Sequence, residues 1–490
     1  MLRFWMIIGL LMLIFPFKSS GQQARLSPNY DSITYQQYLS SDWKALLQTG
    51  KSMLKQKQDY YYLRMRMGIA AMEIRNYSLA EHHFRKALEF NPYSQDALLF
   101  LFQTLRNNYR QLEAGALTGS LSEASRNQLQ LPKSAKLHSL HIDVGYNRRS
   151  NTEGLEFEKL TYGFGQYGYE RVYRNNWFTD GGAFVLARPD LMLYAGIQLI
   201  DVEVIDRFAY LVPELGLLET SQNEFGKAFY YRLESKPSMK EQAHKLTQRA
   251  VYLQLQYSPA TKLRIVGNLT LQGVKSDFTV SEETTVSLSD TAFVNSLSNE
   301  VQMFTANYNA LTFNTVTWTN TDFNAGINSI LSIGKFQPSA GVSLGRINSI
   351  KTLQINTGLS YLPFGNAGLY LRAELFNVIH SNANHFAAKG KMGAKLFSRT
   401  WLEAEFLAGN LNNLSDQYGY ILFNHPEKLR SRSEVVFSFE LSPELLFQLR
   451  YKLLFSERQY YSLNPETTEI ENYKYPIDTQ TITGGLKWHF

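Results

Sequence analysis

The chain of 490 residues is long enough for two or three ordinary domains and for a sizeable buried core. Aromatic residues make up 14% of it while the mean hydropathy is only −0.27, a combination that argues against a helical membrane protein and against disorder. The formal net charge of +6 does not indicate a nucleic-acid-binding protein. The sequence has no cysteine, which excludes disulfides, thiolate catalysis, cysteine-ligated zinc and a lipidated cysteine.

The N-terminus has the pattern of a secretory signal peptide. A basic residue precedes an apolar run that ends at Phe17, and the small residues Ser19 and Gly21 fit a cleavage site. The run is short for a helix that spans a bilayer. We therefore expect residues 1–21 to be removed and Gln22 to begin the mature chain, with an uncleaved anchor helix as the alternative.

Residues 22–115 are expected to form a helical domain. Small, aromatic and proline positions follow a fixed spacing in it, at Gly68, Tyr77, Ala80, Phe84, Ala87 and Pro92. This spacing resembles the tetratricopeptide repeat (TPR), in which Phe84 would fill the space between two helices that approach closely at Gly68, and Pro92 would end the second helix. The flanking helices are degenerate and would complete a short solenoid, and an unrelated helical bundle is the alternative.

The TPR resemblance also implies a binding surface. It places six residues on or near the concave wall of the helical domain: Tyr62, Met65, Arg66, Ile69, Met72 and Glu73. One interpretation is that they bind a periplasmic or outer-membrane protein, since aromatic and arginine side chains commonly dominate interfaces. The other is that they pack against the preceding helices.

A polar linker at 116–135 is expected to lead into a transmembrane β-barrel at 136–490, because apolar and polar residues alternate from there to the last residue. Fourteen antiparallel strands are expected, within a range of twelve to sixteen. They span residues 137–147, 178–187, 191–204, 247–258, 262–278, 322–334, 338–348, 351–362, 367–380, 387–398, 400–411, 431–441, 444–457 and 478–490. Segments 158–174 and 301–320 are also strand-like.

The connections between these strands favour an outer-membrane barrel. Tight turns separate many strands pairwise, while longer polar connections at 205–246, 279–300 and 457–477 separate the pairs. The strand at 444–457 keeps its outward apolar set for about eleven residues, long enough to cross hydrocarbon at a tilt. A soluble sandwich is disfavoured because ordinary strands are shorter.

The C-terminal residues point to the same compartment. Leu486, Trp488 and Phe490 share one face, which resembles the terminal strand recognised by the barrel assembly machinery. The whole layout resembles TPR-containing outer-membrane barrels of Bacteroidota and, by architecture, the surface-lipoprotein assembly modulator and the poly-N-acetylglucosamine exporter. It implies an outer-membrane protein in contact with lipid and lipopolysaccharide, with its helical domain in the periplasm.

Candidate catalytic patterns are weak. Gly341 to Gly345 matches a nucleophile elbow, but the match lies inside an alternating run with no helix after it. His380 and His385 lie near a predicted loop, where solvated histidines are the simpler interpretation. Two further histidine pairs, His82 with His83 and His138 with His141, are poorly spaced to chelate one ion. No catalytic, cofactor-binding or metal-ligating set is predicted.

Charged residues are expected on the inward face of the barrel, where they either pair with one another or line a substrate path. They are Arg264, Arg372, Glu403, Glu405, Glu434, Glu440, Arg450 and Lys487. The function predicted first is a non-enzymatic protein of envelope biogenesis or export, whose TPR module docks a protein partner at the barrel. The alternatives are a channel for polysaccharide or small solutes and, third, a barrel-embedded hydrolase.

Overall fold

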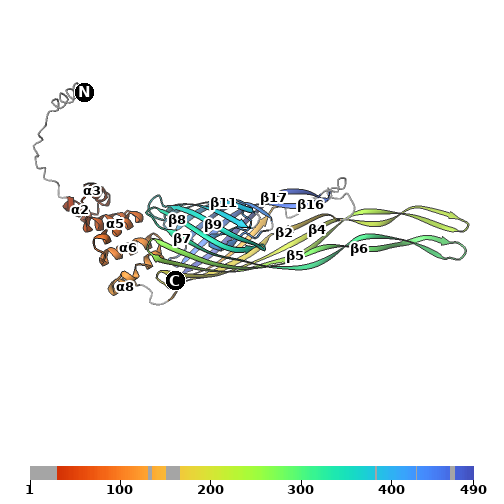
Figure 1. The fold of residues 1–490 in the computed structure, drawn as a ribbon, viewed down its shortest axis with the longest axis horizontal. Helices are drawn as coiled ribbons and strands as arrows, with labels where there is room; N and C mark the ends of the chain where they lie inside the picture. The colour runs from red at the N-terminus through yellow and green to blue at the C-terminus, as the bar shows by residue number, and fades with distance from the viewer. Residues whose placement is uncertain (1–29, 131–134, 151–165, 381–382, 426, 464–469) are drawn as a thin grey trace, which may run out of the picture.

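The computed structural model describes residues 30–130, 135–150, 166–380, 383–425, 427–463 and 470–490. A helical domain lies at one end of a long β-barrel, from which hairpins extend at the other end (Figure 1). The predicted signal peptide, residues 1–21, lies outside the described residues.

The helical domain consists of short helices joined by tight turns. They are α2 (Tyr30–Leu39), α3 (Trp43–Lys55), α4 (Tyr61–Glu73), α5 (Tyr77–Phe90), α6 (Gln95–Asn107), α7 (Gln111–Gly115), the 3-10 helix η1 (Thr118–Ser120) and α8 (Glu123–Gln128). Side chains of Asp42, Asn76 and Ser94 cap α3, α5 and α6 by accepting bonds from backbone amides. Two elements, η1 and α8, fall inside the predicted linker. None of the described helices is long and apolar enough to cross a membrane.

The β-barrel is a closed antiparallel ring. Its strands are β1 (Lys136–Arg149), β3 (Asn176–Arg188), β4 (Leu191–Asn223), β5 (Gly226–Ala260), β6 (Leu263–Asn295), β7 (Val301–Leu331), β8 (Phe336–Ile347), β9 (Ile350–Tyr361), β10 (Leu369–His380), β11 (Ala383–Phe397), β12 (Thr400–Gly409), β15 (Lys428–Glu440), β16 (Leu445–Leu463) and β17 (Ile470–His489). The sheet has fifteen strands in all, and the ring closes through β1 and β17, with Leu140 opposite Trp488. The fifteenth, β2 (Gln166–Tyr173), pairs with β4 and β16 but is not part of the ring. The predicted count of fourteen barrel strands is confirmed.

The outer surface of the barrel is apolar. Along β1, Leu140, Ile142 and Val144 are exposed on the outside. His141 and Asp143, between them, line the interior. Exposed apolar side chains recur on neighbouring strands, among them Leu193, Ile197, Leu199, Val251, Leu253, Leu255, Leu269, Leu271, Ile327 and Ile355. A closed barrel with an apolar outside and a polar inside is the architecture of an outer-membrane β-barrel.

All three long connections that were predicted as loops form strands in their described residues. Within 457–477, β16 runs to Leu463 and β17 begins at Ile470, and the two strands are paired. The segment 205–246 continues β4 and β5 to a turn at Asn223–Gly226, and 279–300 continues β6 towards β7. These hairpins extend far beyond the rest of the barrel (Figure 1). The prediction of loops was wrong here because these extensions lie beyond the apolar band of the barrel. Neither face of an extension contacts lipid, so apolar and polar residues need not alternate along it. The strand-like segment 301–320 is part of β7.

The helical domain covers the end of the barrel that has the tight turns. The Ser78 amide donates to the Gly365 carbonyl in the β9–β10 turn, at 2.8 Å. Arg110 donates to the Thr261 carbonyl in the β5–β6 turn, at 2.7 Å. Gly365 has a φ of +71°, and a Cβ there would lie 2.1 Å from the Asn76 side chain, so this docking requires glycine.

Candidate functional site

A loop from the far end of the barrel folds back into the lumen. It connects β12 to β15, and we call residues 410–425 the plug. The plug contains a two-stranded ladder of β13 (Ser415–Asp416) and β14 (Ile421–Leu422), with the short 3-10 turn η3 (Gln417–Gly419) at its tip. Leu411, Leu414 and Phe423 of the plug pack in an apolar cluster against the barrel wall. The plug is thus a folded part of the interior.

Buried charges hold the plug deep in the barrel. Asp416 is fully buried, and its two carboxylate oxygens accept from Lys389 Nζ at 2.6 Å and from Arg432 Nη2 at 2.7 Å. Glu374 lies 2.6 Å from the same Lys389 ammonium, and Arg432 also pairs with Glu405. Each buried charge therefore has an opposite charge within reach, as a low-dielectric interior requires.

Backbone groups of the plug also form hydrogen bonds with side chains of the barrel wall. The Gln354 side chain donates to the Ser415 carbonyl at 2.7 Å and accepts from the Ser415 amide at 2.9 Å. Thr270 donates to the Gly419 carbonyl at 2.6 Å. Gly419 has a φ of +86°, and a Cβ there would lie 2.3 Å from the Asn268 amide nitrogen. The tip can approach the wall this closely only with glycine.

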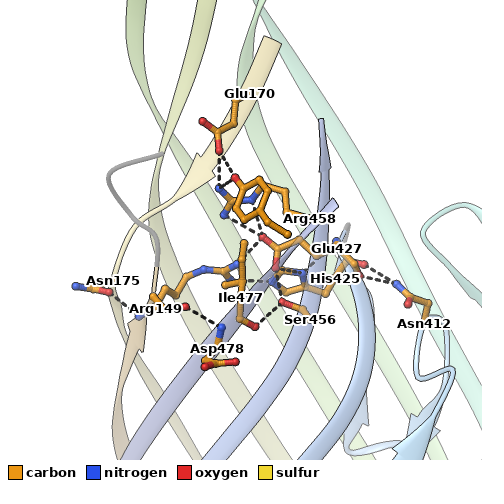
Figure 2. A network of polar contacts seen from close by, with 12 residues as sticks. Arg149, Glu170, Asn175, Asn412, His425, Glu427, Ser456, Arg458, Ile477 and Asp478 are labelled. Atoms are coloured by element: carbon orange, nitrogen blue, oxygen red, sulfur yellow. Dashed lines mark hydrogen bonds and ion pairs between the residues drawn. The ribbon is translucent and has the colours of Figure 1, made fainter. Parts of the chain in front are cut away.

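A second polar network fixes the base of the plug (Figure 2). Glu427 is buried and accepts from Arg149, from Arg458 at 3.1 Å and from Ser456 at 2.8 Å. Nearby, the Asn412 side chain donates to the carbonyl of Glu427 at 2.8 Å and so ties the two ends of the plug together. Strands β1, β15 and β16 are thereby joined at the root of the loop.

The plug does not fill the lumen. A cavity of about 1060 Å³ remains between plug and wall. Its lining mixes aromatic rings, amides and charges, including Tyr194, Tyr252, Gln254, Gln272, Tyr418 and Tyr420. A volume of this size exceeds the ~300–1,000 Å³ of typical small-molecule pockets.

The predicted lumen charges lie where the alternation places them, and most have partners. Glu403 accepts from the Tyr370 hydroxyl, and Glu434 pairs with Arg450 at 3.0 Å. Arg372 pairs with Glu374 at 2.6 Å and donates to the Tyr418 hydroxyl of the plug. The Arg264 guanidinium lies 3.4 Å from the Glu113 carboxylate of α7, and Lys487 lines the cavity. Glu440 lies at the end of the barrel with the tight turns, where its backbone amide donates to the Arg399 carbonyl.

Comparisons with known proteins add little. No family model and no curated protein matches the chain. A FadL homologue from Pseudomonas aeruginosa is similar at 8% identity and a TM-score of 0.39, covering 79% of this chain and 94% of that chain. The toluene transporter TbuX of Ralstonia pickettii has 6% identity and a TM-score of 0.39, over 78% and 98% of the two chains. Scores this low carry no argument about function, and neither structure supports a TPR domain or an origin in Bacteroidota specifically.

Four of the six predicted TPR packing residues, Gly68, Ala80, Phe84 and Ala87, come together in the helical domain. A Cβ at Gly68 would lie 2.5 Å from the Phe84 ring, so the Phe84 ring of α5 packs directly on α4 at this glycine. Ala80, Phe84 and Ala87 are fully buried in one apolar cluster. Tyr77 begins α5, and Pro92 follows its last residue, Phe90, by two positions.

The six predicted wall residues divide into two groups. Tyr62 and Glu73 are exposed. Met65 is buried in the apolar cluster, with Ile69 and Met72 packed against it. Arg66 bonds to Asp31 of α2 at 2.6 Å, so its guanidinium contacts a preceding helix.

The C-terminal residues lie on the outside of the closing strand. Trp488 and Phe490 are exposed, and Leu486 on the same face is half-buried. The Phe490 amide donates to the His138 carbonyl of β1 at 3.0 Å, so the last residue takes part in closing the ring.

The candidate catalytic residues lie in the barrel wall and in the helical domain. Ser343 of the elbow-like pattern lies within β8, where its backbone is extended and pairs with β7 and β9. His385 was expected to be a solvated loop residue, and this was wrong: it is buried in β11 and donates to the Asn412 carbonyl of the plug at 2.9 Å. His138 contacts His489, and His82 is exposed beside the buried His83.

The plug is the feature that the sequence did not disclose. Residues 412–430 were expected only to connect two strands. Their run of Asn, Leu, Ser and Asp has no periodicity that marks it as interior, and several of its partners, such as Gln354 and Tyr252, are distant in the sequence. The one sequence signal was the length of this connection, which is long for a link between two strands and has no apolar alternation of its own.

Proposed function

We propose that the barrel passes small solutes across the outer membrane and that the plug is its gate. The observation that supports this proposal is the cavity of about 1060 Å³ inside the closed ring. It is large enough for one small molecule. The cavity, and not the distant solved structures, is the basis of the proposal.

The lining points to solutes with both a flat apolar face and hydrogen-bonding groups. Tyr194, Tyr252 and Tyr420 cluster with ring centroids 5.1 to 6.3 Å apart. The amide side chains of Gln254 and Gln272 lie on the same wall. Aromatic surfaces combined with a few polar groups are typical of small-molecule sites.

Uptake into proteoliposomes tests the proposal. Asn412 and His425 are hydrogen-bonded at the two ends of the plug, at 3.1 Å, so residues 413–424 can be replaced by a short Gly-Ser linker without moving the strands. We expect the replaced variant to take up radiolabelled glucose faster than the wild-type barrel, and both faster than protein-free liposomes. If neither barrel exceeds protein-free liposomes for glucose, the channel proposal is wrong.

We also propose that the helical domain is TPR-like, lies in the periplasm and docks a protein partner. Two exposed tyrosines, Tyr62 at 66% and Tyr93 at 87%, support a contact surface on this domain. Partner binding at this end would act on the mouth of the barrel that the domain covers.

Arg66 is a poor test residue because it holds α2 to α4 through Asp31. A sharper test changes only the exposed members of the predicted wall. The double variant Tyr62→Ala with Glu73→Ala should lose a protein that co-purifies with the wild type from native membranes, while Lys86→Ala should retain it. Retention of every co-purifying protein by the double variant would contradict docking at this wall.

A further inference from the structure

Two buried carboxylates face each other across neighbouring strands of the barrel. Asp143 of β1 and Asp180 of β3 are direct register partners, and they are only 8% and 5% exposed. Like charges placed directly opposite in a sheet are destabilising, and burial increases the cost. Such a pair is stabilised by a shared proton or by a cation that binds both carboxylates.

A histidine completes the group. His141 lies two residues before Asp143 on the same inward face, and its Nε2 is 3.7 Å from Asp180 Oδ1. One donor atom from each of the three side chains lies within 4.8 Å of the other two. The His141 ring stacks on Tyr194 with ring centroids 5.7 Å apart and an interplanar angle of 13°, which fixes its orientation.

One of the two oxygens of the Asp180 carboxylate has no hydrogen-bond partner among the described residues. This oxygen is Oδ1, which is buried and points towards His141. Among the described lysines and arginines, none forms an ion pair with Asp143 or Asp180 within 4.0 Å. Asp143 projects over Gly485, where a Cβ would lie 1.8 Å from its Oδ1, so β17 leaves space for this carboxylate.

Two cationic side chains act electrostatically on this group without pairing with it. Arg450, whose charge acts on Asp143, pairs with Glu434 through its Nε at 3.0 Å. Lys452, whose charge acts on Asp180, has its ammonium 5.9 Å from the centre of the Phe178 ring. Neither of them forms an ion pair with Asp143 or Asp180 that would balance the two carboxylates directly.

We propose that His141, Asp143 and Asp180 bind a divalent transition-metal ion of the zinc type at the wall of the lumen. One imidazole nitrogen and two carboxylate oxygens are a ligand set that suits Zn²⁺ and its first-row neighbours. Three oxygen and nitrogen donors are too few for Ca²⁺, which takes six to eight oxygens. All three side chains line the cavity, so a further coordination position faces its contents.

Metal binding requires the three side chains to close around the ion. With metal–ligand bonds of about 2.1 Å and tetrahedral angles, two donors of one ion are about 3.4 Å apart. The present donor atoms lie within 4.8 Å of one another, so side-chain rotations must shorten these distances by up to about 1.4 Å. The site does not depend on solute passage, because a barrel that conducts nothing would bind the ion equally well.

Metal binding by the purified full chain tests this site. After treatment with a chelator, the folded barrel in detergent is dialysed against Zn²⁺ and the bound metal is measured per chain. We expect one equivalent in the wild type, and binding weakened at least about tenfold in Asp180→Asn and in His141→Gln. Glu403→Gln, which changes a lumen carboxylate on β12, four strands from β1 around the ring, is the matched control and should keep wild-type binding.

A thermal-unfolding measurement separates a ligand from a structural residue. Zn²⁺ should raise the unfolding midpoint of the wild type and not that of Asp180→Asn. Without metal, Asp180→Asn should be at least as stable as the wild type, since it removes a like-charge contact. Equal Zn²⁺ binding in the wild type and both variants, or no saturable binding by the wild type, would overturn the proposal. So would a loss of stability in metal-free Asp180→Asn.

Discussion

In the helical domain, the buried Arg64 determines the protonation state of a neighbouring histidine. Arg64 of α4 donates two hydrogen bonds to the Asp59 carboxylate, at 2.7 and 2.6 Å, and a third nitrogen of its guanidinium lies 3.1 Å from His83 Nδ1. Because a guanidinium only donates, His83 Nδ1 must accept, and its ring is neutral. Burial, and then the charge of Arg64, lowers the pKa of His83 to about 3.

This depressed pKa makes the helical domain sensitive to acid. Between the ordinary value of 6.5 and about 3, the unfolded domain binds a proton at His83 that the folded domain does not bind. Stability therefore falls as the pH falls through this window, by about 2 kcal/mol at pH 5. In His83→Gln, whose amide oxygen can still accept from Arg64, the pH dependence should be much smaller.

Hydrogen exchange of α4 and α5 at about pH 7.5 and about pH 5, corrected for intrinsic rates, measures this difference. Asp59 does not confuse the result, because its pKa is lowered by the bond from Arg64 and it stays ionised at both values. A variant of the exposed neighbour, His82→Gln, is the control and should retain most of the wild-type pH dependence. Identical pH dependence in His83→Gln and wild type would show that another group is responsible.

At the scale of elements, the plug depends on a compensated charge cluster. Asp416 faces two cations, Lys389 and Arg432, which also contact Glu374 and Glu405. Arg372 also pairs with Glu374, so three cations face three carboxylates, and these charges balance only while the plug is in place. Moving the plug separates Asp416 from both cations, which is costly in a low-dielectric interior. This electrostatic cost would keep the plug in its closed position.

Asp416→Asn should loosen the plug. It leaves an uncompensated positive charge at the anchor, which typically costs about 3–5 kcal/mol in a buried pair. We expect faster hydrogen exchange of residues 411–425 and larger current fluctuations in planar bilayers, with the barrel still folded. The control is Gln417→Asn, which changes the exposed next residue, at φ +50°, to one that tolerates this backbone. Unchanged exchange in Asp416→Asn would mean that the backbone bonds from Gln354 and Thr270 hold the plug alone.

Sequence patterns predicted some elements and not others for a physical reason. Where a strand crosses the apolar band, as in β1 or β16, lipid on one side and polar lumen on the other enforce a period of two, and all fourteen strands were found. In the extensions of β4 to β7 neither face is constrained, so polar segments were taken for loops. The site residues Asp143 and Asp180 are far apart in sequence and meet only through the β1–β3 register, which no local pattern reveals.

At the scale of the whole molecule, the barrel is obstructed at two levels. The helical domain contacts several tight turns, including a ring contact of 5.7 Å between Tyr109 and Trp401. The plug occupies the lumen from the other end, and its tip is tied to the wall through the Tyr418 carbonyl and Tyr252. A solute that crosses must pass both, so opening of the plug and movement of the helical domain are separate steps in the proposed passage. The plug and the helical domain can take these positions only after the barrel has closed correctly in the membrane.

Ring closure makes the last strand decisive for assembly. Trp488 is outward-facing and opposes Leu140 and Leu445, so Trp488→Asp places a charge against lipid beside two apolar neighbours. The direct cost is up to about 1 kcal/mol near an interface and more at depth, and the aromatic recognition face is lost as well. We expect a several-fold decrease in folded, heat-modifiable barrel in outer membranes, and a similar decrease when Phe490 is deleted. Lys487→Gln, which changes the inward face of the same strand, should fold at wild-type levels. Normal amounts of folded barrel in both altered chains would show that this face plays no part in insertion.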